Sequence, residues 1–315
     1  MQLGLIGAGR WGKRYIETIR AMDGVRITHL ASRNPACREW VAADCAITAH
    51  WSEVAQNPDL DGVIVATPPG THLQLALAAI HAGRPVLVEK PMTLSTDEAQ
   101  QLVKAASEGD VLTMVDHTHL FSAAYQTLKR IGADLGPLCA VRSIGCNWGP
   151  FRPDTPALWD WGPHDVAMCV DLFGGPPQRV AATRLSQLAQ PHALGESIHI
   201  ALEYPAATAH IEIGNLASRK QRLFEARYAR GILVYDDLAP DKLTCRVHGD
   251  ANARPVVLDR TLPLTNVVTA FCEAIASPER GRPSLQLALQ VTEILAACEA
   301  QLLGNAPLVS VVPEH

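Results

Sequence analysis

The sequence lacks an excess of basic residues, a long apolar run and a secretory leader. Its 315 residues carry 27 lysines and arginines against 32 aspartates and glutamates, which gives a formal net charge of −5. Nucleic acid is therefore not an expected partner, because a protein that binds it usually presents a basic surface. No apolar stretch approaches the roughly 18 residues of a membrane span. An apolar strand signal begins at residue 2, which leaves no room for a leader. These absences predict a cytoplasmic protein with no membrane partner.

Paired cysteines are also missing. The eight cysteines are scattered, and no two of them form a Cys-x-x-Cys pair. Because several lie inside apolar helical or strand patterns, we interpret them as reduced core residues of a cytosolic protein and not as a disulfide or metal framework. Internal repeats and low-complexity tracts are absent. With 48% hydrophobic and 19% charged residues, the chain has a globular composition and room for two domains.

The first twelve residues, MQLGLIGAGRWG, place a Gly-x-Gly-x-x-Gly run directly after a short apolar strand. This spacing lets the chain turn tightly, lets a pyrophosphate approach the backbone and lets the next helix pack closely on the sheet. Helix N–H groups and the helix dipole then bind the phosphates. A helix pattern and a second strand, Val25–Ala31, complete the βαβ unit. The residues expected to contact the dinucleotide here are Gly7, Gly9, Arg10, Trp11 and Gly12.

The end of the second strand lacks the acidic residue that holds a ribose 2′-hydroxyl in NAD-binding domains. Ser32 and Arg33 occupy that place. A guanidinium can pair with a 2′-phosphate, and the serine can donate a hydrogen bond to it. NADP(H) is therefore the favoured cofactor. The alternative is that Arg33 stacks on the adenine, an arrangement that NAD(H) satisfies equally well.

The two parts of the chain carry different patterns. Up to residue 118, short apolar strands alternate with helices, which predicts a parallel sheet covered on both faces and a Rossmann domain over residues 1–118. Farther on, Glu196–Tyr204 alternates strictly between polar and apolar residues, as in an antiparallel sheet with one buried face. We predict an α/β protein in which residues 119–315 form an α+β domain with an open, mainly antiparallel sheet. Self-association across that sheet would cover it.

The predicted elements can be given by their residues. In the first domain the strands are Leu3–Ile6, Val25–Ala31, Gly62–Ala66, Pro85–Val88 and Val111–Val115, and the helices are Trp11–Met22, Leu73–His81 and Ala99–Ser107. In the second domain the strands are 138–147, 196–204, 207–214, 221–229, 231–236 and 242–248, and the closing helices are Asn266–Ser277 and Leu285–Leu303.

One candidate chemical group lies in PVLVEKP (residues 85–91), an apolar strand that ends in Glu89 and Lys90. A lysine at a strand's carboxyl edge, fixed by the following proline, points its ammonium toward the ligand crevice. There it can stabilise an alkoxide and polarise a carbonyl during hydride transfer. The alternative is a surface lysine that pairs with Glu89. We predict that Lys90 is catalytic and that both residues contact the cofactor.

A second candidate lies in WDWGPHD (residues 159–165), which opens an apolar helix that runs to Phe173. Because proline is common just inside a helix start, Pro163 predicts that His164 lies at the helix N-terminus. The dipole there favours the neutral imidazole that a general base needs. Asp160 can orient the ring and stabilise its protonated form. The alternative is structural: Asp160 caps the helix and His164 packs.

The loop TPPGTH (residues 67–72) follows a predicted strand and precedes a helix. This position suits a contact with the nicotinamide, although Thr71 can equally serve only as a helix cap. The predicted cofactor contacts of this loop are Thr67, Pro68, Pro69 and His72.

Another polar segment, Asp116-His-Thr-His119, follows the last strand of the first domain. A His-x-His pair can bind a metal ion, but no third ligand is evident nearby. We therefore expect no metal and instead a contact between this segment and the cofactor or substrate.

The motifs GAGRWG, ATPPGTH, VEKPMTLS and WDWGPHD together resemble those of the Gfo/Idh/MocA oxidoreductase family in content and order. The resemblance covers residues 1–175 and continues more faintly beyond. It implies a Rossmann domain followed by an open antiparallel sheet through which members form homodimers or homotetramers. It also implies that Lys90 is the family's EKP lysine and that Asp160 and His164 activate a sugar hydroxyl. Thr118 departs from the family's usual Asn or Gln.

Within the family, GPFRPD (residues 149–154) before Trp159-Asp160 resembles a branch that oxidises UDP-N-acetylglucosamine-type sugars at C3. Aromatic faces in this segment suit a sugar ring or a uracil, and Arg152 can meet a phosphate; a rigid aromatic loop is the alternative. Trp161 and His119 replace residues usual in the branch, and Ser32–Arg33 departs from an NAD-type acidic residue. The expected substrate contacts are Lys90, Thr118, His119, Trp148, Arg152, Trp161 and His164.

The predicted function is an NAD(P)-dependent oxidoreductase that transfers a hydride between nicotinamide and a sugar or nucleotide-sugar hydroxyl/ketone pair. His164 takes or returns the hydroxyl proton, Asp160 positions it, and Lys90 stabilises the oxyanion. Two alternatives stay open. One is an NAD-dependent glycosidase that oxidises C3 transiently, and the other is a non-catalytic, cofactor-sensing regulatory protein.

Overall fold

The structure is a computed structural model that describes residues 1–277, 285–304 and 309–310. The chain divides into two compact units. The first comprises Met1–Thr118 and Leu262–Leu289, and the second comprises His119–Thr261 and Gln290–His315. The division after Thr118 coincides with the predicted domain boundary, but the first unit also includes a segment that the sequence analysis placed in the second domain.

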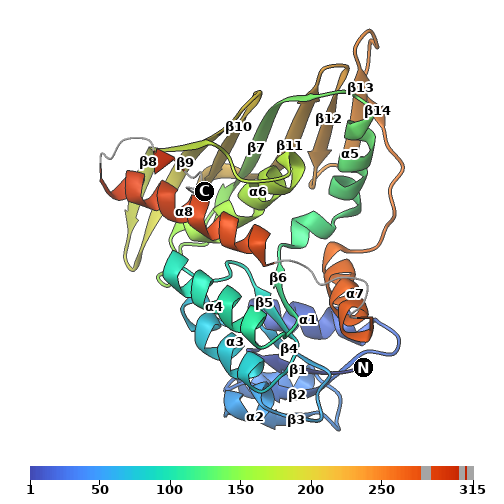
Figure 1. Ribbon diagram of the computed structural model, residues 1–315, viewed down its shortest axis with the longest axis vertical. Coiled ribbons are helices and arrows are strands. Elements are labelled where there is room, and N and C mark those ends of the chain that lie inside the picture. Colours follow the sequence, from blue (N-terminus) through green and yellow to red (C-terminus); the bar gives the residue numbers. More distant parts are fainter. Residues whose placement is uncertain (278–284, 305–308, 311–315) are drawn as a thin grey trace. The chain divides into compact units, whose positions relative to one another are not determined.

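Six parallel strands form the sheet of the first unit, in the order β3-β2-β1-β4-β5-β6 (Figure 1). All residues of β4, β5 and β6 are buried, as expected for a parallel sheet with both faces covered. The predicted Rossmann sheet is confirmed. Its ligand crevice lies outside the carboxyl ends of the strands, where the order reverses between β1 and β4. The strands are β1 (Gln2–Ile6), β2 (Arg26–Ala31), β3 (Ala46–Thr48), β4 (Gly62–Val65), β5 (Val86–Glu89) and β6 (Thr113–Asp116).

Helices cover the faces of this sheet, and one of them begins with a capping box. Ser95 precedes the fourth helix with an extended backbone, and its side chain accepts a hydrogen bond from the Glu98 N–H, as the sequence SxxE predicts. The helices of this unit include α1 (Arg10–Arg20), α2 (Trp51–Ala55), α3 (His72–His81), α4 (Thr96–Glu108) and α7 (Pro263–Ala276).

Helix α7 completes the first unit from a distant part of the sequence. Its buried residues are Leu264, Val267, Val268 and Phe271. A Cβ on Gly62 of β4 would lie 3.0 Å from the Phe271 ring, so the glycine lets the helix approach the strand closely. This packing places α7 with the Rossmann sheet, whereas the sequence analysis assigned it to the second domain.

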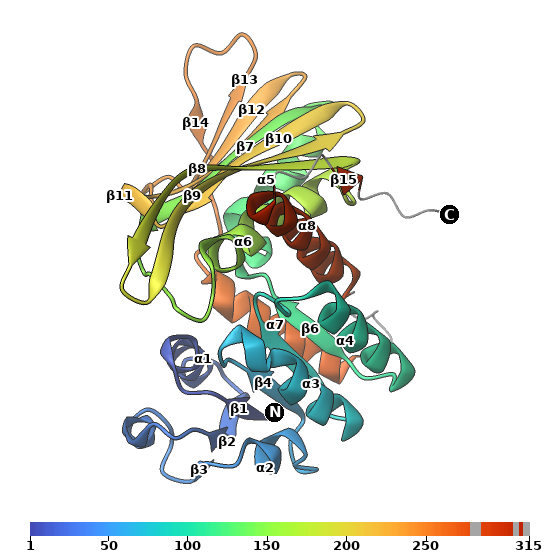
Figure 2. The same ribbon diagram turned by 90° about the vertical axis from the view of Figure 1, so that its left-hand side faces the viewer.

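The second unit contains a nine-stranded sheet in the order β14-β13-β12-β11-β7-β10-β9-β8-β15 (Figure 2). Only β7 and β10 pair in parallel, so the predicted open, mainly antiparallel sheet is confirmed. The strands are β7 (Leu138–Trp148), β8 (Arg179–Gln190), β9 (Ala193–Tyr204), β10 (Ala207–Gly214), β11 (Leu216–Tyr228), β12 (Gly231–Asp236), β13 (Leu243–Val247), β14 (Arg254–Pro255) and β15 (Val309–Ser310).

One face of this sheet is covered by helix α6 (Ala157–Phe173), which packs on β7, β9 and β10. On β9 the alternate residues Ile198, Ile200 and Leu202 are fully buried, which confirms the periodicity read from the sequence. Helix α5 (Ala123–Ala133) packs on β12. Helix α8 (Gln286–Leu303) contributes its residues from Gln290 onward.

Several elements were not predicted from the sequence, namely β3, α2, α5 and β8. Strand β8 is the longest of them, and most of its residues are partly or fully exposed. One of its inward-facing residues is polar: Arg184 forms an ion pair with Glu196 of β9 at 2.8 Å. A half-buried strand is recognised by strict alternation of polar and apolar residues, and a charged residue on the covered face interrupts that alternation.

Candidate functional site

The glycine turn between β1 and α1 has the geometry that a pyrophosphate requires. Gly7 has a φ of +101°, and a Cβ there would lie 2.5 Å from the Ala66 carbonyl oxygen. A Cβ on Gly12 would lie 2.0 Å from the Gly7 oxygen, whereas one on Gly9 would meet nothing within 4 Å. The first and third glycines therefore permit the turn and the helix packing, and the middle one leaves the backbone open. The residues present thus fit a dinucleotide.

The residues that follow this turn lie at the N-terminus of α1. Arg10 is the first helical residue and is exposed. Trp11 is partly exposed, and the Arg14 guanidinium lies 5.5 Å from its ring centroid. Both residues thus flank the positive end of the helix, as predicted for cofactor contacts.

Ser32 and Arg33 lie directly after β2. The Ser32 hydroxyl accepts a hydrogen bond from the Asn34 N–H at 3.0 Å, which fixes the turn. Arg33 is exposed and makes no hydrogen bond or ion pair within the described residues. By contrast, the nearby Arg38 donates to the Cys45 carbonyl at 2.9 Å. Arg33 is therefore available to a ligand and Arg38 is committed to the fold.

The loop after β4 is tied down by His72. This side chain is fully buried, and its two ring nitrogens lie 2.9 Å from the carbonyl oxygens of Thr67 and Pro91. Burial lowers the pKa of His72. His72 thus joins the loops after β4 and β5, so its position accounts for a structural role. Its predicted contact with the cofactor stays a prediction.

Exposed and buried residues alternate in the same loop. Pro68 is exposed and Pro69 is buried, while the hydroxyls of Thr67 and Thr71 share a hydrogen bond of 2.7 Å. Thr71 also donates to the Pro68 carbonyl at 2.8 Å. These bonds hold the loop in one shape at the carboxyl end of β4.

Lys90 follows β5 directly and is 8% exposed. Glu89 is buried, and its Oε2 accepts the Lys90 backbone N–H at 3.1 Å. In register with Glu89 on β6 lies Asp116, which accepts a hydrogen bond from the Thr118 hydroxyl at 2.7 Å. Thr118, predicted to contact substrate, therefore also holds a buried carboxylate.

His117 is the first histidine of the His-x-His pair that the sequence analysis considered as a metal site. It is 4% exposed, and within the described residues neither ring nitrogen has a hydrogen-bond partner. Burial and the nearby Lys90 ammonium lower its pKa to about 4, so it is neutral at pH 7. Its burial could not be predicted from the pair alone. Among the described residues, no group of three potential ligands could hold a metal ion.

In the second unit, α6 begins earlier than predicted. It starts at Ala157, so Pro163 lies inside the helix and His164 is well past the first turn. The prediction that His164 feels the helix N-terminus is therefore wrong, because the effect of the dipole fades within one turn. Proline was mistaken for a start signal. As an interior proline, Pro163 has no N–H to donate to the Trp159 carbonyl, four residues earlier in the helix.

Asp160 and His164 lie one turn apart on α6 and therefore on one side of the helix. His164 is 6% exposed, and its ring makes an edge contact with His119 at 4.9 Å between centroids. The Asp160 side chain is 16% exposed, and its Oδ1 lies 3.6 Å from Arg152. Arg152 also approaches Asp154 at 3.3 Å. The structure thus groups four predicted site residues around one stretch of α6.

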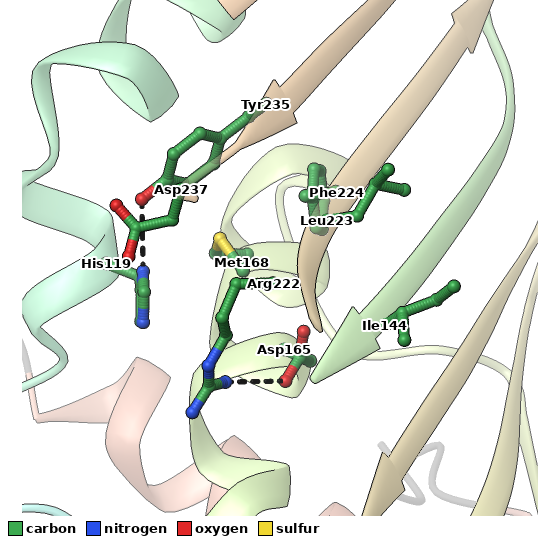
Figure 3. Close-up of a pocket in the computed structure, with 9 residues that line it drawn as sticks. All are labelled: His119, Ile144, Asp165, Met168, Arg222, Leu223, Phe224, Tyr235 and Asp237. Carbon is green, nitrogen blue, oxygen red and sulfur yellow. Dashed lines mark hydrogen bonds and ion pairs between the residues drawn. The ribbon is translucent and has the colours of Figure 1, made fainter. Parts of the chain in front are cut away.

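An adjacent side of α6 carries a second polar cluster that sequence reasoning missed (Figure 3). The Ser143 hydroxyl donates to Asp165 at 2.5 Å, and Arg222 lies 3.9 Å from the other Asp165 oxygen. The Arg222 guanidinium also lies 4.7 Å from the centroid of the Trp161 ring. Trp161, predicted to contact substrate, is therefore 7% exposed and covered by an arginine.

His119 connects the two clusters. Its Nδ1 shares a hydrogen bond of 3.3 Å with the Tyr235 hydroxyl (Figure 3). The small cavity between these side chains has a volume of about 10 Å³, which is room for about one water molecule. The residues in it come from distant elements, so only the fold could reveal them.

A larger cavity of about 250 Å³ lies at the first turn of α6. Arg152 and Arg184 line it together with leucines from α6, β9 and α8. At its edge, the Trp159 Nε1–H donates to Glu299 at 2.9 Å. Trp148, the third tryptophan of this segment, is 55% exposed and lies edge-on to Phe151. The surroundings of Asp160 thus combine charged groups, aromatic surface and open volume.

Comparison with known proteins agrees with this architecture. Residues 1–117 match the family model described as "Oxidoreductase family, NAD-binding Rossmann fold", and residues 125–251 match the GFO/IDH/MocA C-terminal domain. A crystal structure of a putative oxidoreductase from Magnetospirillum magnetotacticum is 39% identical, covers 95% of this chain and 99% of its own, and superposes with a TM-score of 0.89. No helix among the described residues is long and apolar enough to cross a membrane.

Two curated relatives carry named activities. The scyllo-inositol 2-dehydrogenase (NADP(+)) of Bacillus subtilis is 26% identical over 65% of this chain and 60% of its own length. The UDP-N-acetylglucosamine 3-dehydrogenase of Acidithiobacillus ferrooxidans is 29% identical over 58% of this chain and 57% of its own. The alignments thus span about 60% of these relatives. The two matched domain models and the glycine turn lead to one conclusion: this chain belongs to the GFO/IDH/MocA oxidoreductase family.

Proposed function

We propose that this protein is an oxidoreductase that transfers a hydride between NADP(H) and the hydroxyl/ketone pair of a sugar or nucleotide sugar, with C3 as the candidate carbon. One observation carries the proposal. Asp160 and His164 lie one turn apart on a buried helix in a chain whose other unit has the glycine turn of a dinucleotide-binding domain. An acid–base pair and a hydride carrier are the two things that oxidation of a secondary alcohol needs.

His164 is proposed to take the hydroxyl proton during oxidation and to return it during reduction. A general base must be neutral before it acts. Asp160, one turn away, is proposed to orient the ring and to stabilise the imidazolium that forms. Arg152 lies 3.6 Å from Asp160 and would help to hold its carboxylate in place.

Lys90 is proposed to stabilise the oxygen that becomes negative as the carbon–hydrogen bond breaks. Its position directly after β5 is at the edge of the sheet where Rossmann ligands bind. An ammonium in a buried site interacts strongly with developing charge, because the surroundings screen it poorly. Bound nicotinamide supplies the hydride chemistry, and Gly7, Gly9 and Gly12 would hold its pyrophosphate.

The preference for NADP(H) rests on Arg33, with Ser32 beside it. Arg33 is exposed and has no partner within the described part of the chain, so it can pair with a 2′-phosphate. Affinities for NADPH and NADH should be compared for the wild type and Arg33→Ala at one ionic strength. We expect NADPH to weaken about tenfold or more and NADH to change little. Equal losses for both cofactors would end the preference.

The proposed substrate class follows from the relatives together with this site. The names of the two curated relatives include an inositol and a UDP-sugar, both rings with secondary hydroxyls. The exposed Trp148 offers an aromatic face of the kind that packs on such rings. The 250 Å³ cavity beside Arg152 provides space for a substituent of the sugar.

The decisive experiment is a screen of inositols, free aldoses and UDP-sugars, followed by the absorbance of reduced nicotinamide. On the substrate found, His164→Ala should lower turnover about 100- to 10,000-fold with cofactor affinity retained. Lys90→Met should lower turnover without changing the pH optimum of the base. Matched controls are His248→Gln and Lys104→Met, which alter exposed residues outside the site.

The outcomes separate this proposal from its alternatives. Release of free sugar from a glycoside with only catalytic amounts of cofactor would identify a glycosidase. Tight cofactor binding without any absorbance change across the screen would favour a regulatory protein. Unchanged turnover in His164→Ala would remove the proposed base.

We also propose a homodimer or homotetramer assembled through the open sheet. Leu185 and Leu188 of β8 are 53% and 43% exposed, which is unfavourable unless something covers them. Light scattering after size-exclusion chromatography should give a mass of two or four chains, and a monomer would refute this. All eight cysteines lie within described residues as free thiols, which suits the proposed cytoplasmic location.

A further inference from the structure

Two carboxyl groups lie side by side at the carboxyl ends of β5 and β6. Glu89 and Asp116 are register partners, and partners on neighbouring parallel strands project to the same face of the sheet. Their exposed fractions are 3% and 0%. Two ionised carboxylates this close in a buried site would repel each other while each lost its hydration.

Asp116 has the partners of an ionised carboxylate. Its Oδ2 accepts the Tyr15 hydroxyl at 2.5 Å, and its Oδ1 accepts the Thr118 hydroxyl at 2.7 Å. Both oxygens thus receive a proton donor from a side chain, and Tyr15 is itself fully buried. Donors to both oxygens favour the charged form.

Glu89 has the partners of a neutral acid. Its Oε2 accepts only the Lys90 backbone N–H at 3.1 Å, and its Oε1 is buried without a hydrogen-bond partner within the described residues. The Tyr15 hydroxyl has a single proton, and Asp116 Oδ2 accepts it.

We propose that Glu89 and Asp116 share one proton at neutral pH, with Glu89 as the neutral acid and Asp116 as the carboxylate that balances the charge of the Lys90 ammonium. Glu89 and Asp116 are then positioning residues that act through Lys90. Only the role of Lys90 rests on the proposed function. The protonation of the pair is a property of the fold.

The charges around the pair agree with this assignment. Burial, and then repulsion by Asp116, raise the pKa of Glu89 well above its ordinary value. Burial also raises the pKa of Asp116, but Tyr15, Thr118 and Lys90 oppose that rise. His117 is neutral because its pKa is about 4. One carboxylate and one ammonium then remain, and their charges cancel.

The first test is spectroscopic and needs no substrate. In the wild type at pH 7, infrared difference spectra against Glu89→Gln should contain the carbonyl stretch of a protonated carboxyl group. The control Glu108→Gln removes an exposed carboxylate of α4 and should leave that band in place. In Asp116→Asn the repulsion is gone and Tyr15 can donate to Glu89, so Glu89 should ionise and the band should disappear.

The second test compares the variants in stability and in hydride transfer. Glu89→Gln replaces a neutral acid by a neutral amide, so its urea midpoint should match that of Glu108→Gln. The double variant Glu89→Gln/Asp116→Asn removes both carboxyl groups of the pair. Its rate should fall about tenfold or more at alkaline pH, with the alkaline limb of the pH profile moved to lower pH.

The outcomes distinguish this proposal from the proposed function. A wild type without the protonated-carboxyl band at pH 7, or a band that survives Glu89→Gln, overturns the shared proton whatever the activity. If the band behaves as expected but no substrate is turned over, the shared proton stands and the proposed function fails. If the band behaves as expected and the double variant keeps the wild-type pH profile, Asp116 is not the counter-ion of Lys90.

Discussion

Two buried polar clusters, one in each unit, differ in how their charged and polar groups are partnered. In the second unit, Asp165 receives the Ser143 hydroxyl at 2.5 Å and forms an ion pair with Arg222 at 3.9 Å. In the first unit, Glu89 Oε1 and both ring nitrogens of His117 are buried without hydrogen-bond partners among the described residues. An ion-paired cluster holds elements together, whereas unused hydrogen-bonding capacity is costly to the fold and marks a place for a proton, water or ligand.

The largest expected effect on stability comes from removing the ion pair between Asp165 and Arg222. Arg222→Met removes the cation that faces a 3% exposed Asp165 side chain and leaves a buried carboxyl group with only one donor. We expect the free energy of unfolding to fall by about 3 kcal/mol, measured by urea denaturation at pH 7. Burial already raises the pKa of Asp165, and loss of Arg222 should raise it further.

A control variant lies on the same strand. Arg227→Met removes a guanidinium whose side chain is 57% exposed and pairs with Glu225 at 2.6 Å. An exposed ion pair contributes about 0 to 1 kcal/mol. Equal losses for the two arginine variants would show that the Asp165 cluster is no more important to stability than a surface pair.

The glycine turn allows a second comparison, between Gly12, where a side chain would clash, and Gly9, where it would not. Gly12→Ala would place a Cβ 2.0 Å from the Gly7 carbonyl oxygen, so α1 must move away from the turn. We expect a loss of about 2 kcal/mol in the free energy of unfolding together with loss of cofactor binding. Calorimetry and urea denaturation would measure both.

Gly9→Ala is the matched change in the same turn. A Cβ there meets nothing within 4 Å, so stability should change by less than about 1 kcal/mol. Cofactor affinity should nevertheless fall, because the methyl group occupies the space where the pyrophosphate approaches the backbone. If Gly9→Ala kept full affinity, the cofactor would have to bind elsewhere.

The buried His117 ring, which has no hydrogen-bond partner among the described residues, should make stability depend on pH. Its pKa of about 4 lies below the ordinary value, so the unfolded chain binds the proton more readily than the folded one. Its contribution to stability is therefore present above pH 6.5 and is lost as the pH falls toward 4. Between pH 7.5 and 5 the loss should be about 2 kcal/mol.

His117→Leu should remove that part of the acid sensitivity and leave stability at pH 7.5 unchanged or higher, since it deletes a polar group without partners. Urea midpoints at the two pH values would measure it. His248→Gln, an exposed site, is the control. A wild-type pH dependence in His117→Leu would assign the acid sensitivity to other groups, such as His72, whose pKa is also lowered by burial.

Local patterns were enough to predict most of the fold. The glycine turn and the apolar strands identified the Rossmann sheet, and the alternation of Glu196–Tyr204 identified the second sheet. The start of α6 was missed because Pro163 has the same local signature inside a helix as at its beginning. The place of α7 in the first unit depends on Phe271 packing on Gly62, a contact between residues far apart in the sequence.

The candidate site could be predicted only where one segment carries it. Asp160 and His164 are four residues apart, so their common side of α6 follows from helical periodicity alone. Asp165 and Arg222 come from α6 and β11, and Glu89 pairs with Asp116 only through the strand register. No pattern in a single sequence encodes which distant charges will be neighbours.

The smallest expected effect concerns a single buried polar atom of the second unit. Trp161 Nε1 is buried and has no hydrogen-bond partner among the described residues. Trp161→Phe deletes this unused donor but weakens the contact with Arg222, whose guanidinium lies 4.7 Å from the ring centroid. The two effects oppose each other, so the free energy of unfolding should change by less than about 1 kcal/mol.

The control is Trp159→Phe, two residues earlier on the same helix, where the indole Nε1–H donates a hydrogen bond to Glu299 at 2.9 Å. It should cost about 1 to 2 kcal/mol, more than Trp161→Phe. If the free donor of Trp161 serves a ligand, Trp161→Phe should also raise the KM for the substrate several-fold while leaving stability alone. A stability loss in Trp161→Phe equal to that in Trp159→Phe would show that the Trp161 indole N–H stabilises the fold and is not reserved for a ligand.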